Sequence, residues 1–353
     1  MDLFSAGPWS SGVALAHLEG LRAGGPVHRL DDTRFAVLGH REAVQVLTDA
    51  KTFTSRFGTG KFHVEVPGRS LNLSDPPHST SLRRTLSLPS TADRTLARRL
   101  LTGLVERGGG DLVTEFAQPL ALGTFGAAFE LEGEDLARLG ALTRGLAQAP
   151  DAGSFQRADA VLRSWLAEHR GAPGRFFELG AGLSPGDQQY LQRLLAQTGH
   201  ESTAMAIVLA LEVLIRRDLP FDPSPEAVDE LLRFTSPLIR FVREVTTPTR
   251  LGDVALDAGA RVAVFFPAVN RDPAVFARPD EVDLARRPNP HLAFGAGPHA
   301  CFGAELARQQ LMDTLQAFAA IPRPQLGPCV ALSSSVTRGF SSLVMRVRGA
   351  GPS

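Results

Sequence analysis

The chain has 353 residues, of which 43% are apolar, and its 37 basic and 37 acidic side chains give a net charge of zero. This composition supports a sizeable buried core and argues against nucleic acid as a partner, because no polybasic tail is evident. Two cysteines, Cys301 and Cys329, exclude a disulfide framework and fit a reducing compartment. No signal peptide is visible, and the longest apolar stretch, Ala204 to Leu211, falls short of the roughly 18 residues of a membrane span. We therefore expect a cytoplasmic protein that does not enter a membrane.

The first part of the chain is expected to mix short helices and strands. Periodicity places helices at 12–21 and 40–49 and strands at 27–29 and 34–38. A further helix begins after Asp75-Pro76-Pro77, since proline is favoured in the first turn of a helix. This helix carries Arg83 and Arg84.

A helical middle follows. Helices are expected at 91–107, 111–129, 132–149 and 155–169, and Pro119 should kink or restart the second of them because proline cannot donate to the preceding turn. A long helix from Pro185 to Arg216 is capped by Ser184. Gly199 lies in its middle beside hydroxyl side chains that can bond back to the preceding turn, so we expect the helix to open or bend there.

The C-terminal part returns to strands after a helix at 225–234. Glu230 and Arg233 lie three residues apart on that helix, so they face the same side and can form an ion pair. Hairpins are expected at 250–266, turning around Asp257 to Gly259, and near the C-terminus. These elements predict a mainly α fold with a small β subdomain, built as one domain over residues 1–353. Its β-rich parts are expected at about 27–38, 240–266 and 325–348, and its helical core at about 75–235 and 303–319.

A lone cysteine, Cys301, lies in a glycine-punctuated loop directly before a helix at 303–318. Free amides and the positive dipole end at a helix N-terminus stabilise a thiolate. Three roles are open for this sulfur: a buried thiol that packs as a small apolar group, a catalytic nucleophile that needs a positioned base, or an axial ligand of haem iron. The glycines, which let the loop lie flat beneath a macrocycle, and the ring of Phe294 favour the haem ligand.

The run Phe294-Gly-x-Gly-x-His299-x-Cys301-x-Gly303 resembles the haem-binding signature of the cytochrome P-450 family, with every signature position filled. The resemblance implies the cytochrome P-450 fold and a haem whose iron is bound by the thiolate of Cys301. It also implies that the loop residues around the sulfur contact the cofactor: Phe294, Gly295, His299 and Gly303.

The resemblance implies further contacts to the haem propionates. Arg243 and Arg83 match the family's two propionate-binding arginines. The histidine position four residues before the second arginine holds Ser79, and the nearest histidine, His78, lies one residue early. A shift of one residue turns a side chain by roughly 100° on a helix. Similarly, the pair noted above, Glu230 and Arg233, matches the family's structural Glu-x-x-Arg pair.

The sequence Gly199-x-Glu201-Ser202 resembles the oxygen-binding helix of the same family, which has a glycine, any residue, an acid and a hydroxyl. This implies that Glu201 and Ser202 relay protons during oxygen activation, and Thr203 can share the role. The family usually has threonine where this chain has Ser202. Serine keeps the hydroxyl and loses the methyl that fixes its rotamer, which puts tight coupling of electrons to product in question.

Alternation along a strand at 236–243 places Ile239, Phe241 and Arg243 on one side. Arg240, between them, either recognises an acidic substrate or points to solvent. The resemblance implies that the following residues edge the substrate pocket: Leu238, Ile239, Arg240 and Phe241. It also implies that the glycine-rich segment 53–73 roofs the pocket and that the tip of the C-terminal hairpin enters it. The roof residues that would face a ligand are Phe57, Phe62 and Val64.

The implied reaction inserts one oxygen atom from dioxygen into a small apolar organic substrate, with haem (iron protoporphyrin IX) as cofactor. Electrons would come from a ferredoxin-type donor and its NAD(P)H reductase, and Arg83, Arg84 and Arg308 would suit an acidic ferredoxin. Two alternatives stay open. One is a haem-thiolate peroxygenase that uses hydrogen peroxide directly, and the other is a non-catalytic haem protein that binds or senses a ligand.

Overall fold

The computed structural model describes residues 2–11, 13–57, 71–84, 86, 93–147, 149 and 152–347. Its helices are α1 (Gly7–Ser10), α2 (Val13–Arg22), α3 (His40–Thr48), α4 (His78–Arg84), α5 (Leu96–Glu106), the π-helix η1 (Leu112–Ala117), α6 (Gln118–Phe129), α7 (Gly133–Ala147), α8 (Ala152–Glu168), α9 (Arg175–Glu178), α10 (Pro185–Thr198), α11 (Glu201–Arg216), α12 (Pro225–Thr235), α13 (Phe266–Val269), the 3-10 helix η2 (Gly297–His299) and α14 (Ala304–Ala319). Its strands are β1 (Val27–Arg29), β2 (Arg34–Val37), β3 (Phe53–Thr54), β4 (Gly109–Asp111), β5 (Arg240–Val245), β6 (Thr249–Leu251), β7 (Val254–Leu256), β8 (Arg261–Phe265), β9 (Gln325–Ala331) and β10 (Phe340–Arg346). The predicted class, mainly α with small sheets, is confirmed.

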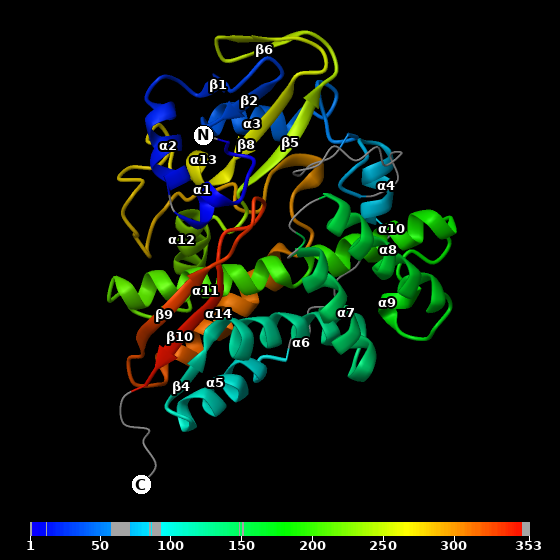
Figure 1. The fold of residues 1–353 in the computed structure, drawn as a ribbon. Helices are drawn as coiled ribbons and strands as arrows, with labels where there is room; N and C mark the ends of the chain where they lie inside the picture. Colours follow the sequence, from blue (N-terminus) through cyan, green and yellow to red (C-terminus); the bar gives the residue numbers. More distant parts are fainter. Residues whose placement is uncertain are drawn as a thin grey trace.

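The strands of the described chain form three sheets. The largest has the strand order β1-β2-β8-β5-β3, and the others are β4-β10-β9 and β6-β7. β2 runs parallel to β8, with Phe35 opposite Val262, while the remaining neighbours in that sheet are antiparallel. Figure 1 shows the large sheet with α1 to α3 at the top of the molecule and β9-β10 at the lower left.

Helix α11 crosses the middle of the molecule between the large sheet and helices α5 and α6 (Figure 1). All of its residues from 203 to 211 are buried, and a helix that is apolar on every side belongs in a core. It packs with α12 and α14 in a cluster that includes Ile207, Leu211 and Phe318. Within the described chain, α10 and α11 taken together are the one stretch long and apolar enough to cross a membrane, and 67% of its most apolar window is buried inside the protein.

The segment expected as one helix at 111–129 begins with the π-helical turn η1 and continues as α6. The carboxylate of Asp111 caps the turn by accepting from the amides of Val113 at 2.8 Å and Thr114 at 3.0 Å. Pro119 lies in the first turn of α6, where its missing N–H is tolerated, so the restart expected at the proline is confirmed. The glycines before this segment do more than separate two helices, because they pair with β10 as strand β4.

The hairpin expected at 250–266 has a different pairing in the structure. β6 pairs with β7 across a turn that contains Gly252, whose φ is +56°. β8 instead enters the large sheet between β2 and β5, and the turn expected at Asp257 to Gly259 carries the chain from one sheet to the other. The turn at Gly252 and the turn at 257–259 both contain Asp and Gly. Local composition therefore could not show which of the two joins the paired strands of a hairpin.

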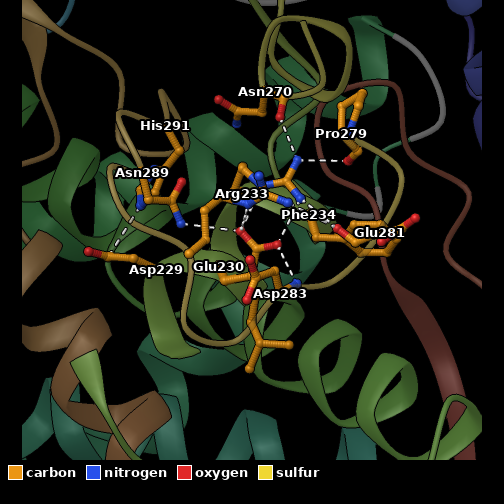
Figure 2. A network of polar contacts seen from close by, with 12 residues as sticks. Asp229, Glu230, Arg233, Phe234, Asn270, Pro279, Glu281, Asp283, Asn289 and His291 are labelled. Atoms are coloured by element: carbon orange, nitrogen blue, oxygen red, sulfur yellow. Dashed lines mark hydrogen bonds and ion pairs between the residues drawn. The ribbon is translucent and has the colours of Figure 1, made fainter. Parts of the chain in front are cut away.

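Helix α12 carries a buried ion network that holds the chain after α13 in place (Figure 2). Arg233 donates to both carboxylate oxygens of Glu230, at 2.8 and 2.9 Å, and neither side chain is exposed. The ion pair expected from their spacing is therefore present. Arg233 also donates to three main-chain carbonyl oxygens between α13 and the cysteine loop, those of Asn270, Pro279 and Glu281.

Arg286 is a third member of this network that the sequence did not reveal. Its Nε donates to Glu230 at 2.9 Å, and its Nη1 donates to the carbonyl oxygen of Ala277 at 2.7 Å. Glu230 also accepts from the amide of Asp283 at 2.8 Å. Since a buried charge is tolerated only when it is paired and hydrogen-bonded, the network determines the path of the segment that leads to Cys301.

Substituting Arg286→Met should lower the free energy of unfolding by about 3 kcal/mol or more, because it removes one partner of a buried charge. The matched control is Arg278→Met, whose ion pair with Glu281 is largely exposed and should contribute less than about 1 kcal/mol. Urea denaturation followed by circular dichroism measures both. Equal losses in the two variants would contradict a structural role for the network.

Candidate active site

The loop that carries Cys301 folds tightly against α3. Gly295 and Gly297 have φ of +69° and +68°, a region that favours glycine. A Cβ atom on Gly297 would lie 2.6 Å from the carbonyl oxygen of Leu47, so a side chain does not fit there. The amide of Cys301 donates to the carbonyl oxygen of Phe294 at 2.8 Å, which closes the loop.

The sulfur of Cys301 opens into a cavity of about 1790 Å³, and α14 begins directly after it with Gly303 as the N-cap. Because protein surrounds the cavity, burial raises the pKa of the thiol above its usual range. The amide of Gly303 and the guanidinium groups of Arg83 and Arg308 oppose this rise without cancelling it. The helix terminus therefore favours the thiolate, as expected, and a metal cation bound to the sulfur would favour it further.

Two arginines line the cavity beside the cysteine loop. Arg243 is only 2% exposed, and it donates from Nη1 to the carbonyl oxygen of Val242 at 2.9 Å. Burial lowers its pKa to about 10. Arg83 donates to the carbonyl oxygen of Ala300 at 2.6 Å and lies over the ring of Phe302. Both cations are thus held by neutral groups and can still bind anions in the cavity.

His299 lies at the same edge of the cavity. Its Nε2 is 3.3 Å from the hydroxyl of Ser55, and its Nδ1 is buried without a hydrogen-bond partner among the described residues. Burial, followed by the charge of Arg243, lowers its pKa to about 4. The ring is therefore neutral at physiological pH.

The structure does not bring His78 to this edge. His78 is the first residue of α4 and is exposed, whereas Ser79 is 1% exposed and its hydroxyl oxygen has no partner in the part of the chain that is described. The offset of one residue turns the histidine to solvent and the serine inward. The propionate contact expected from His78 has no support in this geometry.

The break between α10 and α11 forms a second wall of the cavity, where one continuous helix with a local opening was expected. A Cβ atom on Gly199 would lie 2.7 Å from the ring of Phe125, so only glycine lets α6 approach this closely. The hydroxyl of Ser202 donates across the break to the carbonyl oxygen of Thr198 at 3.0 Å. The predicted bond to the preceding turn is therefore present, and it leaves two separate helices.

Glu201, Ser202 and Thr203 all line the cavity from this break. The Oε1 atom of Glu201 is buried and has no hydrogen-bond partner among the residues described. Burial raises the pKa of this carboxyl above its usual range, and Arg144 opposes the rise. A carboxyl whose pKa is raised in this way is better suited to proton transfer near neutral pH than an exposed one, and it lines the cavity.

His200 is a buried histidine behind Glu201 for which no role was expected from the sequence. Its Nε2 is 3.0 Å from the hydroxyl of Thr143, and its Nδ1 is 3.8 Å from Oε1 of Glu201. Since the Thr143 hydroxyl donates to the carbonyl oxygen of Leu139, it accepts from the imidazole, which carries its proton on Nε2. Burial, followed by the charge of Arg144, lowers the pKa of His200 to about 4.

Leu238 and Phe241 line the cavity, as expected for substrate contacts, but Ile239 does not. β5 begins only at Arg240, and the amide of Ile239 donates to the carbonyl oxygen of Val336 at 2.8 Å. Strand alternation therefore does not extend back to Ile239, which turns into the apolar cluster beneath α1 and α2.

Arg240 neither points to solvent nor reaches the cavity, so both roles considered for it are wrong. It is 1% exposed, lies 4.4 Å from the ring of Phe4 and donates to the carbonyl oxygen of Ser335. It faces away from Phe241 because neighbouring residues of a strand point to opposite faces. Its role in this structure is to hold the N-terminal segment against the C-terminal hairpin.

The tip of the β9-β10 hairpin forms a third wall, and residues 332–337 all line the cavity, as predicted. Bonds to the main chain of residues 235–237 hold the tip. The amide of Arg338 donates to the carbonyl oxygen of Pro237 at 2.7 Å, and the side chain of Arg338 donates to the carbonyl oxygen of Thr235 at 2.6 Å.

Of the expected roof residues, Phe57 is 40% exposed and does not line the cavity. Phe62 and Val64 lie outside the described residues.

The site thus consists of a large cavity that the sulfur of Cys301 faces. Comparison of the chain with known proteins shows the class to which it belongs. A family model described as Cytochrome P-450 matches residues 225–336. The chain is 32% identical to nocardicin C N-oxygenase of Nocardia uniformis subsp. tsuyamanensis, over 79% of this chain and 79% of that protein. It is 30% identical to a cytochrome P-450 of Rhodopseudomonas palustris, over 93% of this chain and 90% of that protein.

The same class emerges from solved structures. A Mycobacterium marinum cytochrome P-450 in complex with pseudoionone matches with a TM-score of 0.82 and 26% identity, covering 96% of this chain and 95% of that one. The chain belongs to the cytochrome P-450 family, whose cofactor is a haem with an axial thiolate. It is therefore a haem-thiolate oxidoreductase of the monooxygenase type.

The described residues fit this cofactor. Cys301 offers a sulfur at the cavity surface, and Arg83 and Arg243 offer cations at the same edge for the two propionates. No group of three or more His, Cys, Asp and Glu side chains in the described chain could hold a metal ion. A single protein ligand, the sulfur of Cys301, suffices for haem, because the macrocycle itself supplies nitrogen ligands.

The buried neutral state of His200 predicts a loss of stability in mild acid. Its pKa is about 4 in the folded chain and about 6.5 in an unfolded chain, so the unfolded chain binds the proton first as the pH falls from 6.5 towards 4. Relative to His200→Gln, the wild type should lose about 2 kcal/mol of unfolding free energy between pH 7 and pH 5. Urea denaturation at several pH values measures the difference, and the exposed control His78→Gln should follow the wild type. Parallel pH profiles for wild type and His200→Gln would refute this.

Proposed function

We propose that Cys301 binds haem iron as its axial thiolate and that Arg243, Arg83 and His299 hold the propionate edge of the cofactor. The observation that carries this proposal is one continuous cavity, lined by the cysteine sulfur and by the three residues of the broken helix. Phe294, Gly295 and Gly303 complete the cysteine loop on the other side of the cofactor.

Haem bound through a thiolate supplies the activation of dioxygen, since thiolate donation favours cleavage of the O–O bond. The protein supplies protons and excludes water. Glu201, whose carboxyl has a raised pKa and a free oxygen in the cavity wall, is the proton donor. The hydroxyl of Ser202 donates to the carbonyl oxygen of Thr198, so its oxygen can accept a hydrogen bond in the cavity. For Ser202 to relay a proton, its hydroxyl must turn from Thr198 and donate into the cavity, and Thr203 can support it.

A small apolar organic substrate would lie against Leu238, Phe241 and the hairpin tip. Leu332, Val336 and Phe340 add apolar surface from that tip. One oxygen atom would be inserted into the part of the substrate nearest to the iron.

The electron donor proposed for this cytoplasmic protein is a ferredoxin with an NAD(P)H reductase. Arg84 is exposed one residue after the cavity-lining Arg83, where an acidic partner can approach the cysteine side of the cofactor. Arg308 contributes less, because its guanidinium already pairs with Asp229 and Glu305.

Cys301→Ser should abolish the strongly red-shifted Soret band of the reduced carbon monoxide complex, because an alcohol cannot donate charge to iron as a thiolate does. A difference spectrum of the dithionite-reduced protein with and without carbon monoxide measures this. A wild-type spectrum like that of a histidine-ligated globin would overturn the assignment.

Turnover with redox partners and dioxygen should exceed turnover with hydrogen peroxide, and the reverse order would favour a peroxygenase.

Arg84→Glu should slow reduction by ferredoxin about 10-fold at low ionic strength, since it reverses a charge at the docking surface. Stopped-flow reduction in carbon monoxide-saturated buffer measures the rate and its dependence on salt. Arg29→Glu, an exposed arginine on the far sheet, serves as the control. Unchanged rates and salt dependence in Arg84→Glu would place the docking surface elsewhere.

A further inference from the structure

The part of the cavity formed by α7, α8 and α10 is cationic. These three helices pack together, and each contributes one arginine to the lining: Arg144 from α7, Arg163 from α8 and Arg193 from α10. The acids that line the cavity among the described residues are Asp159 and Glu201. Apart from the two arginines at the propionate edge, the described lining therefore has at least one more positive than negative charge.

Asp159 is shared between two of these arginines. Its carboxylate pairs with Arg193 and lies 3.1 Å from Nε of Arg163. One negative charge therefore faces two positive charges, and the cluster keeps a net charge of plus one. Arg193 also lies 5.9 Å from the centre of the Phe155 ring.

Arg144 has no counter-ion within ion-pair distance among the described residues. It acts on Glu201 and His200 only through its charge at a distance. Arg144 is half-buried, where an unpaired guanidinium is costly and a bound anion would stabilise it.

Near the cysteine loop and the hairpin tip, the cavity has apolar surface beside the hydroxyl groups of residues 333–335 and 337. The apolar side chains there include Leu238, Phe241, Met205, Ala206 and Val336. A ligand that fills both ends must therefore have an apolar body and a negatively charged group. Guanidinium binds a carboxylate through two parallel hydrogen bonds, and a single carboxylate matches the small excess of positive charge.

We propose that the substrate is an amphipathic carboxylic acid, whose carboxylate binds to Arg144 in the field of Arg163 and Arg193 and whose apolar body extends towards Cys301. This inference rests on the monooxygenase function proposed above and names its class of substrate. It places the recognition of an acid on helices α7, α8 and α10, whereas the sequence offered Arg240 as one of two alternatives.

Calorimetric titration with decanoic acid and with its methyl ester at about pH 7.5 tests the proposal on the haem-loaded protein. The acid is ionised at this pH, and it should bind about 10-fold more tightly than the ester despite its lower hydrophobicity. Arg144→Met should weaken binding of the acid about 10-fold and change binding of the ester less than about 2-fold. Arg138→Met, an exposed arginine on the same helix, should change neither.

Asp159→Asn provides a variant with the opposite expected sign. Removing the acid shared by Arg163 and Arg193 should tighten binding of decanoate about 3-fold or more and leave the ester unaffected. A tighter complex cannot result from misfolding. Weaker or unchanged binding of the acid in this variant would overturn the proposal.

The carbon monoxide difference spectrum of each variant separates this inference from the function on which it rests. If the wild type lacks the red-shifted band, the monooxygenase assignment fails. If the band is present but acid and ester bind equally, the substrate class proposed here is wrong. If Arg144→Met alters the coupling of electrons to product but not the ratio of acid to ester affinity, Arg144 acts only through its charge on Glu201 and the proposal is likewise overturned.

Discussion

The burial of Arg233 is the interaction on which the rest of the structure depends. A guanidinium without exposed surface must find its anions and acceptors inside the protein, and this one binds Glu230 and three main-chain carbonyl groups. Those carbonyls belong to an irregular segment in which the described chain has no strand. Hydrogen bonds between strands therefore do not hold this segment in place. Satisfying one buried charge therefore determines the path of the chain up to the loop that presents Cys301 (Figure 2).

The features that were predictable from sequence are those set by local chemistry. Gly295 and Gly297 are required by their backbone angles, and Gly297 also by the contact with Leu47. Residues with such local requirements are visible in a sequence, so the loop was recognisable by its resemblance to the family signature. The opening at Gly199 was predictable for a similar reason, because glycine followed by hydroxyl residues weakens a helix wherever it occurs.

The features that were not predictable depend on distant parts of the chain. Arg286 completes the network from 56 positions away from Glu230, and nothing in its immediate surroundings distinguishes it from other arginines. The orientation of Ile239 is set by the hairpin tip through its bond to Val336. Likewise, the cationic part of the cavity combines Arg144, Arg163 and Arg193 from three different helices. The sequence does not specify how these helices pack. Local periodicity carries no information about such partners.

The main-chain attachment of the hairpin tip has a consequence for how the protein can change. The tip is held to residues 235–239 by backbone groups and by Arg338, while the side chains of residues 332–337 face the cavity. Ser334 is an exception, because its hydroxyl accepts from the amides of Val336 and Thr337 and so helps to hold the turn. At Leu332 and Val336, binding preference and wall stability reside in different atoms of the same residue, the side chain and the backbone. Substitutions at these two positions can reshape the cavity while the backbone bonds of the tip remain, so they are well placed for selectivity to diverge by mutation, in nature or in directed evolution.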